Sequence, residues 1–220
     1  MDFAAARARL VECLSTEIRD KQVLAAMSRV PRERFVPSEY QYLAYEDCPL
    51  PIGFDQTISQ PFIVALMTEA LELSGREKVL EVGTGSGYQA AILAELARSV
   101  ITVERVPALA ESARKVLDSL GYTNIEVHLA EETLGWLAEA PYEAIIVTAG
   151  APSVPPDLLA QLAISGRMVI PVGSRYMQEL CKATKRKKKN TVQNLGGCRF
   201  VSLIGKGAWE EEGDCLLREV

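Results

Sequence analysis

The sequence predicts an α/β fold with a mostly parallel sheet, helices on both faces, antiparallel strands at one edge and a helical N-terminal extension. Three observations predict it. From Lys78 onward, short apolar runs alternate with segments of helical periodicity, as in parallel strands joined by crossover helices. A glycine-rich turn follows the first of these runs. With 220 residues, of which 48% are hydrophobic and 24% charged, the chain can bury a core without disulfides or metal.

The chain is expected to form one compact unit from two segments, residues 1–75 and 76–220. The first segment shows helical spacing of its apolar residues, interrupted by prolines, and is expected to pack on the second. Its predicted elements are helices over Phe3–Leu14 and Lys21–Met27, an extended or turn segment over Cys48–Gly53, and a helix that starts near Ser59, has Pro61 in its first turn and ends at Ser74-Gly75.

The second segment is expected to carry the sheet. Its predicted strands are Lys78–Val82, Val100–Glu104, Ile125–Leu129, Ala144–Thr148 and Met168–Pro171. The helices between them are predicted from the glycine turn through Ala97, over Ala108–Leu120 and over Pro156–Ala163. Two further strands, Gln178–Thr184 and Phe200–Ile204, are expected to form an antiparallel pair around a basic segment.

Charge is distributed unevenly along the chain. The formal net charge is −5, but six basic residues fall within Lys182–Lys189, which leaves 18 basic against 29 acidic residues elsewhere. A mostly acidic protein is poorly suited to follow a phosphate backbone, so no nucleic-acid partner is expected. The basic run is interpreted as a solvated loop tip, because like charges repel and rarely pack; a nucleic-acid or targeting patch is the alternative.

Composition also bears on compartment and metal chemistry. No stretch approaches the ~18 consecutive apolar residues of a membrane span. Charged residues interrupt the first 30 residues, unlike a signal peptide. The five cysteines form no Cys-x-x-Cys pair, and His128 is the only histidine, so a multi-histidine or zinc site is not expected. A cytoplasmic protein without a catalytic metal is predicted.

The strongest local signal is Val79-Leu-Glu-Val-Gly-Thr-Gly-Ser-Gly87, a glycine-rich turn between a strand and a helix. Glycines there let a ligand approach the backbone and leave N–H groups exposed at the start of the helix. The spacing is G-x-G-x-G. Tyr88 stands where a dinucleotide fingerprint needs its third glycine, which makes a nicotinamide-dependent oxidoreductase the weakest alternative.

Two carboxylates flank this turn. Glu104 ends the next strand, where a carboxylate can accept hydrogen bonds from both hydroxyls of a ribose, and Glu81 adds a second negative charge. Such a pair disfavours a pyrophosphate and suits a cationic nucleoside such as S-adenosylmethionine, which carries a sulfonium, an ammonium and a ribose. The residues alone leave open a plain glycine turn with two surface glutamates, and they do not identify a methyl acceptor.

Several segments, most of them outside the turn, resemble a known family. They are Val30-Pro-Arg-Glu-Arg-Phe-Val-Pro37, Leu50-Pro-Ile-Gly53, Gln56-Thr-Ile-Ser-Gln-Pro61, Leu80–Ala90, Ala144–Ala149, Val169–Gly173 and Phe200–Gly205. In this order they are similar to bacterial protein-L-isoaspartate O-methyltransferases, and the match spans most of the chain. The resemblance implies a Rossmann-like, S-adenosylmethionine-dependent methyltransferase fold, with residues 1–75 on the acceptor side.

The resemblance also implies the reaction and the site. S-adenosylmethionine would donate its methyl group to the free carboxylate of L-isoaspartyl residues in damaged proteins and peptides, leaving S-adenosylhomocysteine. The family's active-site serine falls on Ser59. By position, the family's cofactor contacts fall on Gln56, Thr57, Ile58, Ser59, Glu81, Gly83, Thr84, Gly85, Ser86, Gly87, Glu104 and Arg105.

The chain departs from the family after the third strand. The family usually has Gly-Asp-Gly there, with the aspartate near the adenine, whereas this chain has Ala130-Glu131-Glu132. Glu131 keeps the acid on a longer side chain, and Glu132 lacks a glycine's backbone freedom. We expect Glu131 to serve as a cofactor contact in place of the aspartate.

The expected chemistry needs no general base. A free carboxyl with a pKa near ~4 is already an anionic nucleophile at neutral pH. We expect the Ser59 hydroxyl to orient that carboxylate by donating a hydrogen bond. From the residues alone, Ser59 is better explained as an N-cap of the following helix; the resemblance reverses that preference.

Two other functions remain possible on sequence grounds. One is an S-adenosylmethionine-dependent methyltransferase for a different acceptor. The other is a non-catalytic S-adenosylmethionine-binding protein, which only Glu131-Glu132 favours. The expected partners are isoaspartyl proteins and peptides, with no nucleic acid or membrane, and the chain is expected to act as a monomer.

Overall fold

The computed structural model describes residues 2–210. Its helices are α1 (Phe3–Leu14), α2 (Lys21–Arg29), α3 (Pro61–Ala70), α4 (Tyr88–Ala94), α5 (Pro107–Ser119) and α6 (Pro156–Gln161), with short 3-10 segments η1 (Arg32–Phe35), η2 (Ser38–Leu43) and η3 (Leu137–Glu139). Its strands are β1 (Leu50–Gly53), β2 (Gln56–Ile58), β3 (Lys78–Val82), β4 (Ser99–Glu104), β5 (Ile125–Leu129), β6 (Tyr142–Val147), β7 (Leu162–Gly173), β8 (Gln178–Thr184) and β9 (Thr191–Cys198).

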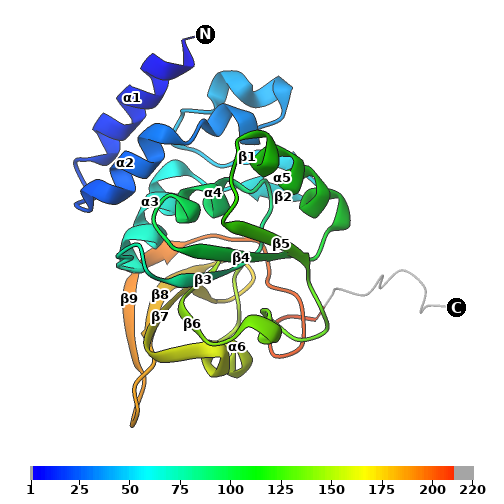
Figure 1. Ribbon diagram of the computed structural model, residues 1–220. Helices are drawn as coiled ribbons and strands as arrows, with labels where there is room; N and C mark the ends of the chain where they lie inside the picture. Colours follow the sequence, from blue (N-terminus) through cyan, green and yellow to red (C-terminus); the bar gives the residue numbers. More distant parts are fainter. Residues whose placement is uncertain (1, 211–220) are drawn as a thin grey trace, which may run out of the picture.

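Seven of these strands form one sheet in the order β5-β4-β3-β6-β7-β8-β9 (Figure 1). Strands β5 to β7 pair in parallel, and β8 and β9 continue the sheet in antiparallel pairing. Strands β1 and β2 form a separate antiparallel hairpin. The predicted α/β fold, with antiparallel edge strands and a helical N-terminal extension, is confirmed.

The sheet separates two apolar clusters, because successive side chains of a strand point to opposite faces. Val79 belongs to the cluster shared with α1 to α4, and the next residue, Leu80, to the cluster that α6 covers. Figure 1 shows α1 to α5 on one side of the sheet and α6 on the other. The N-terminal segment is part of this core, since Leu14 and Met27 lie in the same cluster as Ile92 of α4.

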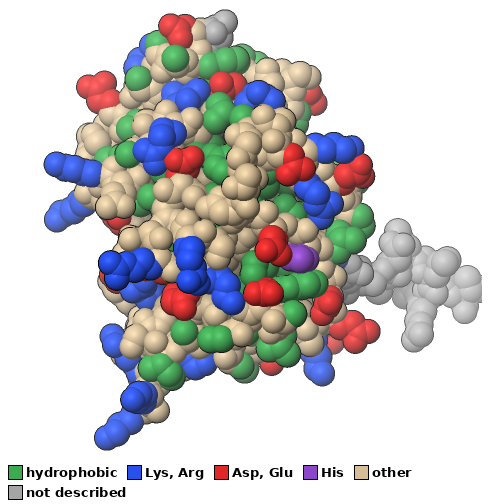
Figure 2. Space-filling view, viewed as in Figure 1, with side chains coloured by type: hydrophobic (Ala, Val, Ile, Leu, Met, Phe, Trp, Pro, Cys, Tyr) green, Lys and Arg blue, Asp and Glu red, His purple; other side chains and the backbone are tan. Residues whose placement is uncertain are grey.

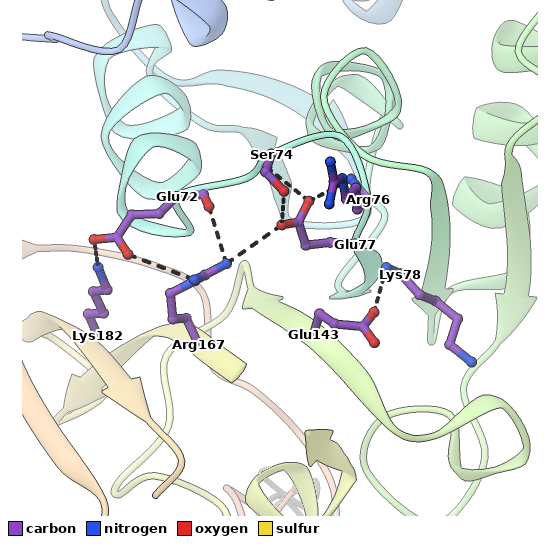
Figure 3. A network of polar contacts seen from close by, with 8 residues as sticks. All are labelled: Glu72, Ser74, Arg76, Glu77, Lys78, Glu143, Arg167 and Lys182. Atoms are coloured by element: carbon purple, nitrogen blue, oxygen red, sulfur yellow. Dashed lines mark hydrogen bonds and ion pairs between the residues drawn. The ribbon is translucent and has the colours of Figure 1, made fainter. Parts of the chain in front are cut away.

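A polar network connects the segment after α3 to the strands (Figure 3). Glu72 accepts from Lys182 of β8 at 2.5 Å, and its backbone carbonyl accepts from the Arg167 guanidinium of β7 at 3.2 Å. Arg167 also lies 3.9 Å from Glu77, whose carboxylate accepts from the Ser74 backbone N–H at 2.9 Å. The segment that leads into β3 is thereby tied to the antiparallel edge.

One predicted strand is wrong. The partner of β8 is β9, directly after the basic turn, and Phe200–Ile204 makes only isolated bridges. β9 escaped prediction because most of its residues are exposed, so the strand shows no apolar alternation. Four of the six basic residues of the run lie where expected: Arg186 and Lys187–Lys189 are exposed at the tip of the β8-β9 hairpin, which projects from the molecule (Figure 2). The other two are not solvated tip residues, since Lys182 bonds to Glu72 and Lys185 to the Leu162 carbonyl.

Candidate active site

The glycine turn lies between β3 and α4, at the carboxyl ends of the parallel strands. Gly83, Gly85 and Gly87 all have positive φ angles, of 102°, 52° and 89°. A Cβ on Gly83 would lie 2.2 Å from the Thr148 hydroxyl oxygen, so only glycine fits there. That hydroxyl donates to the Gly83 carbonyl at 2.7 Å, which holds the turn against the end of β6.

Glu104 lies under the same turn, at the end of β4. One of its carboxylate oxygens accepts from the Gly85 backbone N–H at 2.8 Å, and the other from the Val106 backbone N–H at 2.9 Å. Each oxygen keeps a further lone pair with which it can accept from a ligand hydroxyl. Glu104 therefore fixes the turn and also lines the cavity above it.

Glu81 does not join Glu104 in the cavity. Its side chain is fully buried behind the turn, where one oxygen accepts from the Thr102 hydroxyl at 2.5 Å and the other has no partner among residues 2–210. Burial raises the pKa of Glu81 to about 8, so this carboxyl is mostly protonated at neutral pH. The expectation of a second negative charge at the crevice is wrong: of the two carboxylates, only Glu104 lines the cavity.

Most of the predicted site residues line one cavity of about 940 Å³, near the upper end of the roughly 300–1,000 Å³ usual for ligand sites. The predicted residues that line it are Gln56, Thr57, Ile58, Ser59, Gly83, Thr84, Gly85, Ser86, Glu104, Arg105 and Glu131. Gly87 and Glu81 are the two that do not. The size suits two ligands side by side better than a single nucleoside.

Ser59 stands between the β1-β2 hairpin and α3, facing this cavity from the N-terminal segment. It is not the N-cap of α3: that position is Gln60, and the Phe62 backbone N–H of the first turn donates to Asp47 at 2.8 Å. The Ser59 hydroxyl has no hydrogen-bond partner among the residues that the structure describes. The capping role is therefore excluded by geometry, and the hydroxyl is available to a ligand.

Glu131 lies in the loop after β5, where the backbone N–H of Ala130 donates to the Glu104 carbonyl at 2.8 Å. The Glu131 side chain is exposed at the rim of the cavity. Glu131 and Glu104 therefore border the same space. Both acids that line this wall can contact one ligand.

Several lining residues were missed by sequence reasoning. Arg175 and Tyr176 come from the turn between β7 and β8, and residues 197–204 form the end of β9 and the segment after it. Arg175 lies 4.8 Å above the Trp209 ring and donates to the Ser202 hydroxyl at 3.4 Å. The carboxyl end of β7 could have indicated Arg175, because ligands bind at that edge of a parallel sheet. Nothing in the sequence pattern indicated residues 197–204 beyond the family resemblance.

The donor set of the cavity suits an organic cation. The Glu104 carboxylate and the exposed Glu131 provide acceptors and negative charge on one wall. Within residues 2–210, no three His, Cys, Asp or Glu side chains come together in a way that could hold a metal ion. No helix of that part of the chain is long and apolar enough to cross a membrane.

Comparison with protein families supports one assignment. The family described as protein-L-isoaspartate(D-aspartate) O-methyltransferase matches residues 6–208. The protein-L-isoaspartate O-methyltransferase of Geobacter metallireducens is 55% identical over 215 residues, covering 96% of this chain and 100% of that protein. That of Dictyoglomus turgidum is 54% identical over 206 residues, covering 93% and 94%.

Solved structures give the same result. One described as a protein-L-isoaspartate O-methyltransferase superposes with a TM-score of 0.83 at 27% identity, covering 92% of this chain and 67% of the other. A Plasmodium falciparum structure described as such an enzyme in complex with S-adenosyl-L-homocysteine has a TM-score of 0.77 at 26% identity, covering 91% and 99%.

Proposed function

Because this chain belongs to the protein-L-isoaspartate(D-aspartate) O-methyltransferase family, we propose that it transfers a methyl group from S-adenosylmethionine to L-isoaspartyl residues in damaged proteins and peptides. The match of the family model over residues 6–208 carries this proposal. The cavity supports it, since one wall suits a cationic nucleoside and the other holds the Ser59 hydroxyl, which has no hydrogen-bond partner within residues 2–210. The reaction is the first step of protein repair.

The cofactor is proposed to lie against the wall formed by the glycine turn. Glu104 accepts from the ribose hydroxyls, the backbone of the glycine turn packs against the donor, and Arg105 and Glu131 border the adenine end. Gln56, Thr57 and Ile58 contact it from the hairpin side. When bound, S-adenosylmethionine supplies a methyl group on a positively charged sulfur, which the acidic wall tolerates.

The acceptor is proposed to lie against Ser59. Its carboxylate is ionised at neutral pH, because an ordinary carboxyl has a pKa near ~4, so no general base is required. The Ser59 hydroxyl donates to one carboxylate oxygen and leaves the other directed at the methyl carbon. Orientation of this kind can supply several kcal/mol of the barrier, up to about 10.

Repair follows from the chemistry of the product. The methyl ester is attacked by the backbone nitrogen of the following residue, which forms a succinimide and releases methanol. Water then opens the succinimide ring at either carbonyl, and one of the two products is normal aspartate. The enzyme is needed only for the methylation.

We propose that residues 1–75 provide the acceptor-side wall and residues 76–220 the cofactor-binding core. Support comes from the cavity, where residues 49, 55–60, 63, 64 and 67 belong to the first segment. We also propose that the protein acts as a cytoplasmic monomer without nucleic-acid or membrane partners. The acidic charge outside the basic hairpin and the absence of a Cys-x-x-Cys pair support this.

The function is tested with labelled S-adenosylmethionine and two peptides that differ only in isoaspartyl against aspartyl. The isoaspartyl peptide is expected to take up label, and base treatment is expected to release labelled methanol, as an ester does. Equal labelling of both peptides would reject the repair function in favour of a methyltransferase for another acceptor. Cofactor binding with no transfer to either peptide would favour a binding protein.

A further inference from the structure

Arg32 is a buried cation that has no acidic partner among residues 2–210. It lies in η1 with 0% of its surface exposed. Within residues 2–210 no carboxylate lies within ion-pair distance of its guanidinium, and its Nη1 atom has no hydrogen-bond partner. Burying a guanidinium without a paired carboxylate is costly, and an apolar side chain of similar volume is often as good for stability. A role in stability alone therefore explains Arg32 poorly.

The contacts of Arg32 reach both walls of the cavity. Its Nη2 donates to the backbone carbonyl of Ser59 at 2.8 Å, and its Nε to the carbonyl of Ala44 at 2.9 Å. Its Cζ lies 4.8 Å from the centre of the Tyr88 ring. Tyr88 is the first residue of α4, directly after the glycine turn, and Phe35 of η1 also packs edge-on against that ring at 5.5 Å.

We propose that Arg32 is a positioning residue for methyl transfer. Its rigid guanidinium fixes the position of Ser59 relative to the glycine turn. The inference rests on the proposed function, because it assigns Ser59 to the acceptor. Ser59 and Tyr88 both line the cavity. The Arg32 side chain connects them, because it donates to the Ser59 carbonyl and lies over the Tyr88 ring. Arg32 itself does not line the cavity.

The guanidinium is suited to this task by its shape. It is planar and presents its donors in a fixed fork, so the two carbonyls it binds are held at a fixed angle to each other and to the ring beneath. A lysine ammonium is a flexible point charge that cannot reproduce that geometry. Methyl transfer needs the acceptor oxygen, the methyl carbon and the sulfur in line, and a misplacement of about 1 Å can cost about 100-fold in rate.

The test compares Arg32→Lys with Arg34→Lys, a matched control in the same 3-10 segment whose side chain is exposed and reaches Ser119 at 3.2 Å. For Arg32→Lys we expect kcat on an isoaspartyl peptide to fall about 10- to 100-fold, while affinity for S-adenosylhomocysteine changes by less than about twofold. Amide exchange in residues 57–60 is expected to become faster. Arg34→Lys is expected to match the wild type in all three measurements.

Two results would overturn the proposal. One is an unchanged kcat in Arg32→Lys, and the other is a loss of kcat that runs parallel to losses of cofactor affinity and melting temperature. Should Arg32→Lys fail to fold, Arg32→Gln, which buries no charge and can still donate to one carbonyl, is measured against the same criteria. A wild-type protein inactive on the peptide would reject the proposed function, and the exchange measurement would then decide the role of Arg32.

Discussion

The two walls of the cavity are held in place by different means. On the cofactor side, the glycine turn is fixed by backbone groups of adjacent strands: the Gly83 and Thr84 N–H groups both donate to the Val103 carbonyl, at 2.9 and 3.2 Å. On the acceptor side, the segment around Ser59 is fixed by side chains from distant parts of the chain. Arg32 holds its carbonyl, and Asp47 accepts from the first turn of α3.

Strand pairing can therefore determine the position of the cofactor wall but not that of the acceptor wall. A turn that directly follows a strand of a parallel sheet inherits its position from the register of that strand with its neighbours, so a local sequence pattern is enough to build it. The acceptor wall lies outside the sheet, and its position depends on a few long-range polar contacts. We expect substitutions on the acceptor side to change turnover and those on the cofactor side to change binding.

The largest effect is expected for Ser59→Ala, which tests the acceptor wall directly. Loss of one donor that orients the reacting carboxylate is expected to lower kcat by about 100-fold or more, in the range seen for removal of a single transition-state hydrogen bond. Calorimetric affinity for S-adenosylhomocysteine is expected to stay near wild type, because the glycine turn is untouched. Ser38→Ala, at an exposed serine of η2, is the control. Full activity of a folded Ser59→Ala protein would remove Ser59 from the mechanism.

The next largest effect is expected for Glu104→Ala, which attacks the cofactor wall. The substitution removes the proposed contacts to ribose and also the acceptor for the Gly85 N–H. Affinity for S-adenosylhomocysteine is expected to fall about 10- to 100-fold, the equivalent of about 1.5–3 kcal/mol for a charge-assisted hydrogen bond. Glu111→Ala, at an exposed position of α5, is expected to bind as the wild type does. Unchanged binding by Glu104→Ala would contradict the assignment of this wall to the cofactor.

Glu81→Gln tests whether the buried acid behind the turn is structural. Burial raises the pKa of Glu81 to about 8 in the folded protein, against about 4.3 in an unfolded chain. The folded state thus holds a proton that the unfolded state releases. The contribution of Glu81 to stability is therefore complete below a pH of about 4.3 and is lost as the pH rises to about 8. Over this range the folding equilibrium constant is expected to fall by less than tenfold per pH unit.

Denaturant unfolding of wild type and Glu81→Gln across this pH window checks the expectation. Glutamine resembles the protonated carboxyl and does not titrate, so the wild type is expected to lose stability relative to the variant as pH rises. Cofactor affinity is expected to change little at neutral pH, because Glu81 does not line the cavity. Parallel pH dependence of the two proteins would show that Glu81 titrates normally.

Sequence patterns predicted the parallel half of the fold well and the acceptor wall poorly. The bounds of β3 and β5 agree with prediction, because each is a short run set off by turns or changes of periodicity, and those of the antiparallel β8 agree as well. β9 was missed because an exposed edge strand needs no apolar alternation. Arg32 was missed for a related reason: a charged residue in a short polar stretch is ordinarily exposed, and only long-range packing, against Tyr88 of α4 and the carbonyls of Ala44 and Ser59, buries it.

The candidate site shows the same division. The positions of the glycine turn and Glu104 at the ends of two neighbouring strands predicted that both would line the cavity. The second role of Glu104, as the acceptor for two backbone N–H groups, needs the folded turn. Glu81 was misjudged because its strand position alone does not tell which face of the sheet a side chain takes. The family resemblance assigned Ser59, where local sequence favoured a helix cap that the structure gives to other groups.

The smallest effect is expected for Glu131→Gln, which tests whether the cofactor wall extends as far as Glu131. Unlike Glu104, Glu131 is exposed, so water competes for its carboxylate and a single contact there is weak. If its carboxylate accepts from the adenine amino group, Glu131→Gln is expected to weaken affinity for S-adenosylhomocysteine by about two- to fivefold, since an amide oxygen is a poorer acceptor. Glu131→Asp is expected to bind at least as well as the wild type, because it restores the side-chain length usual in the family. Glu132→Gln, one residue further from the cavity wall, is the control. Equal affinity in all four proteins would show that the cofactor wall ends at Glu104 and Arg105.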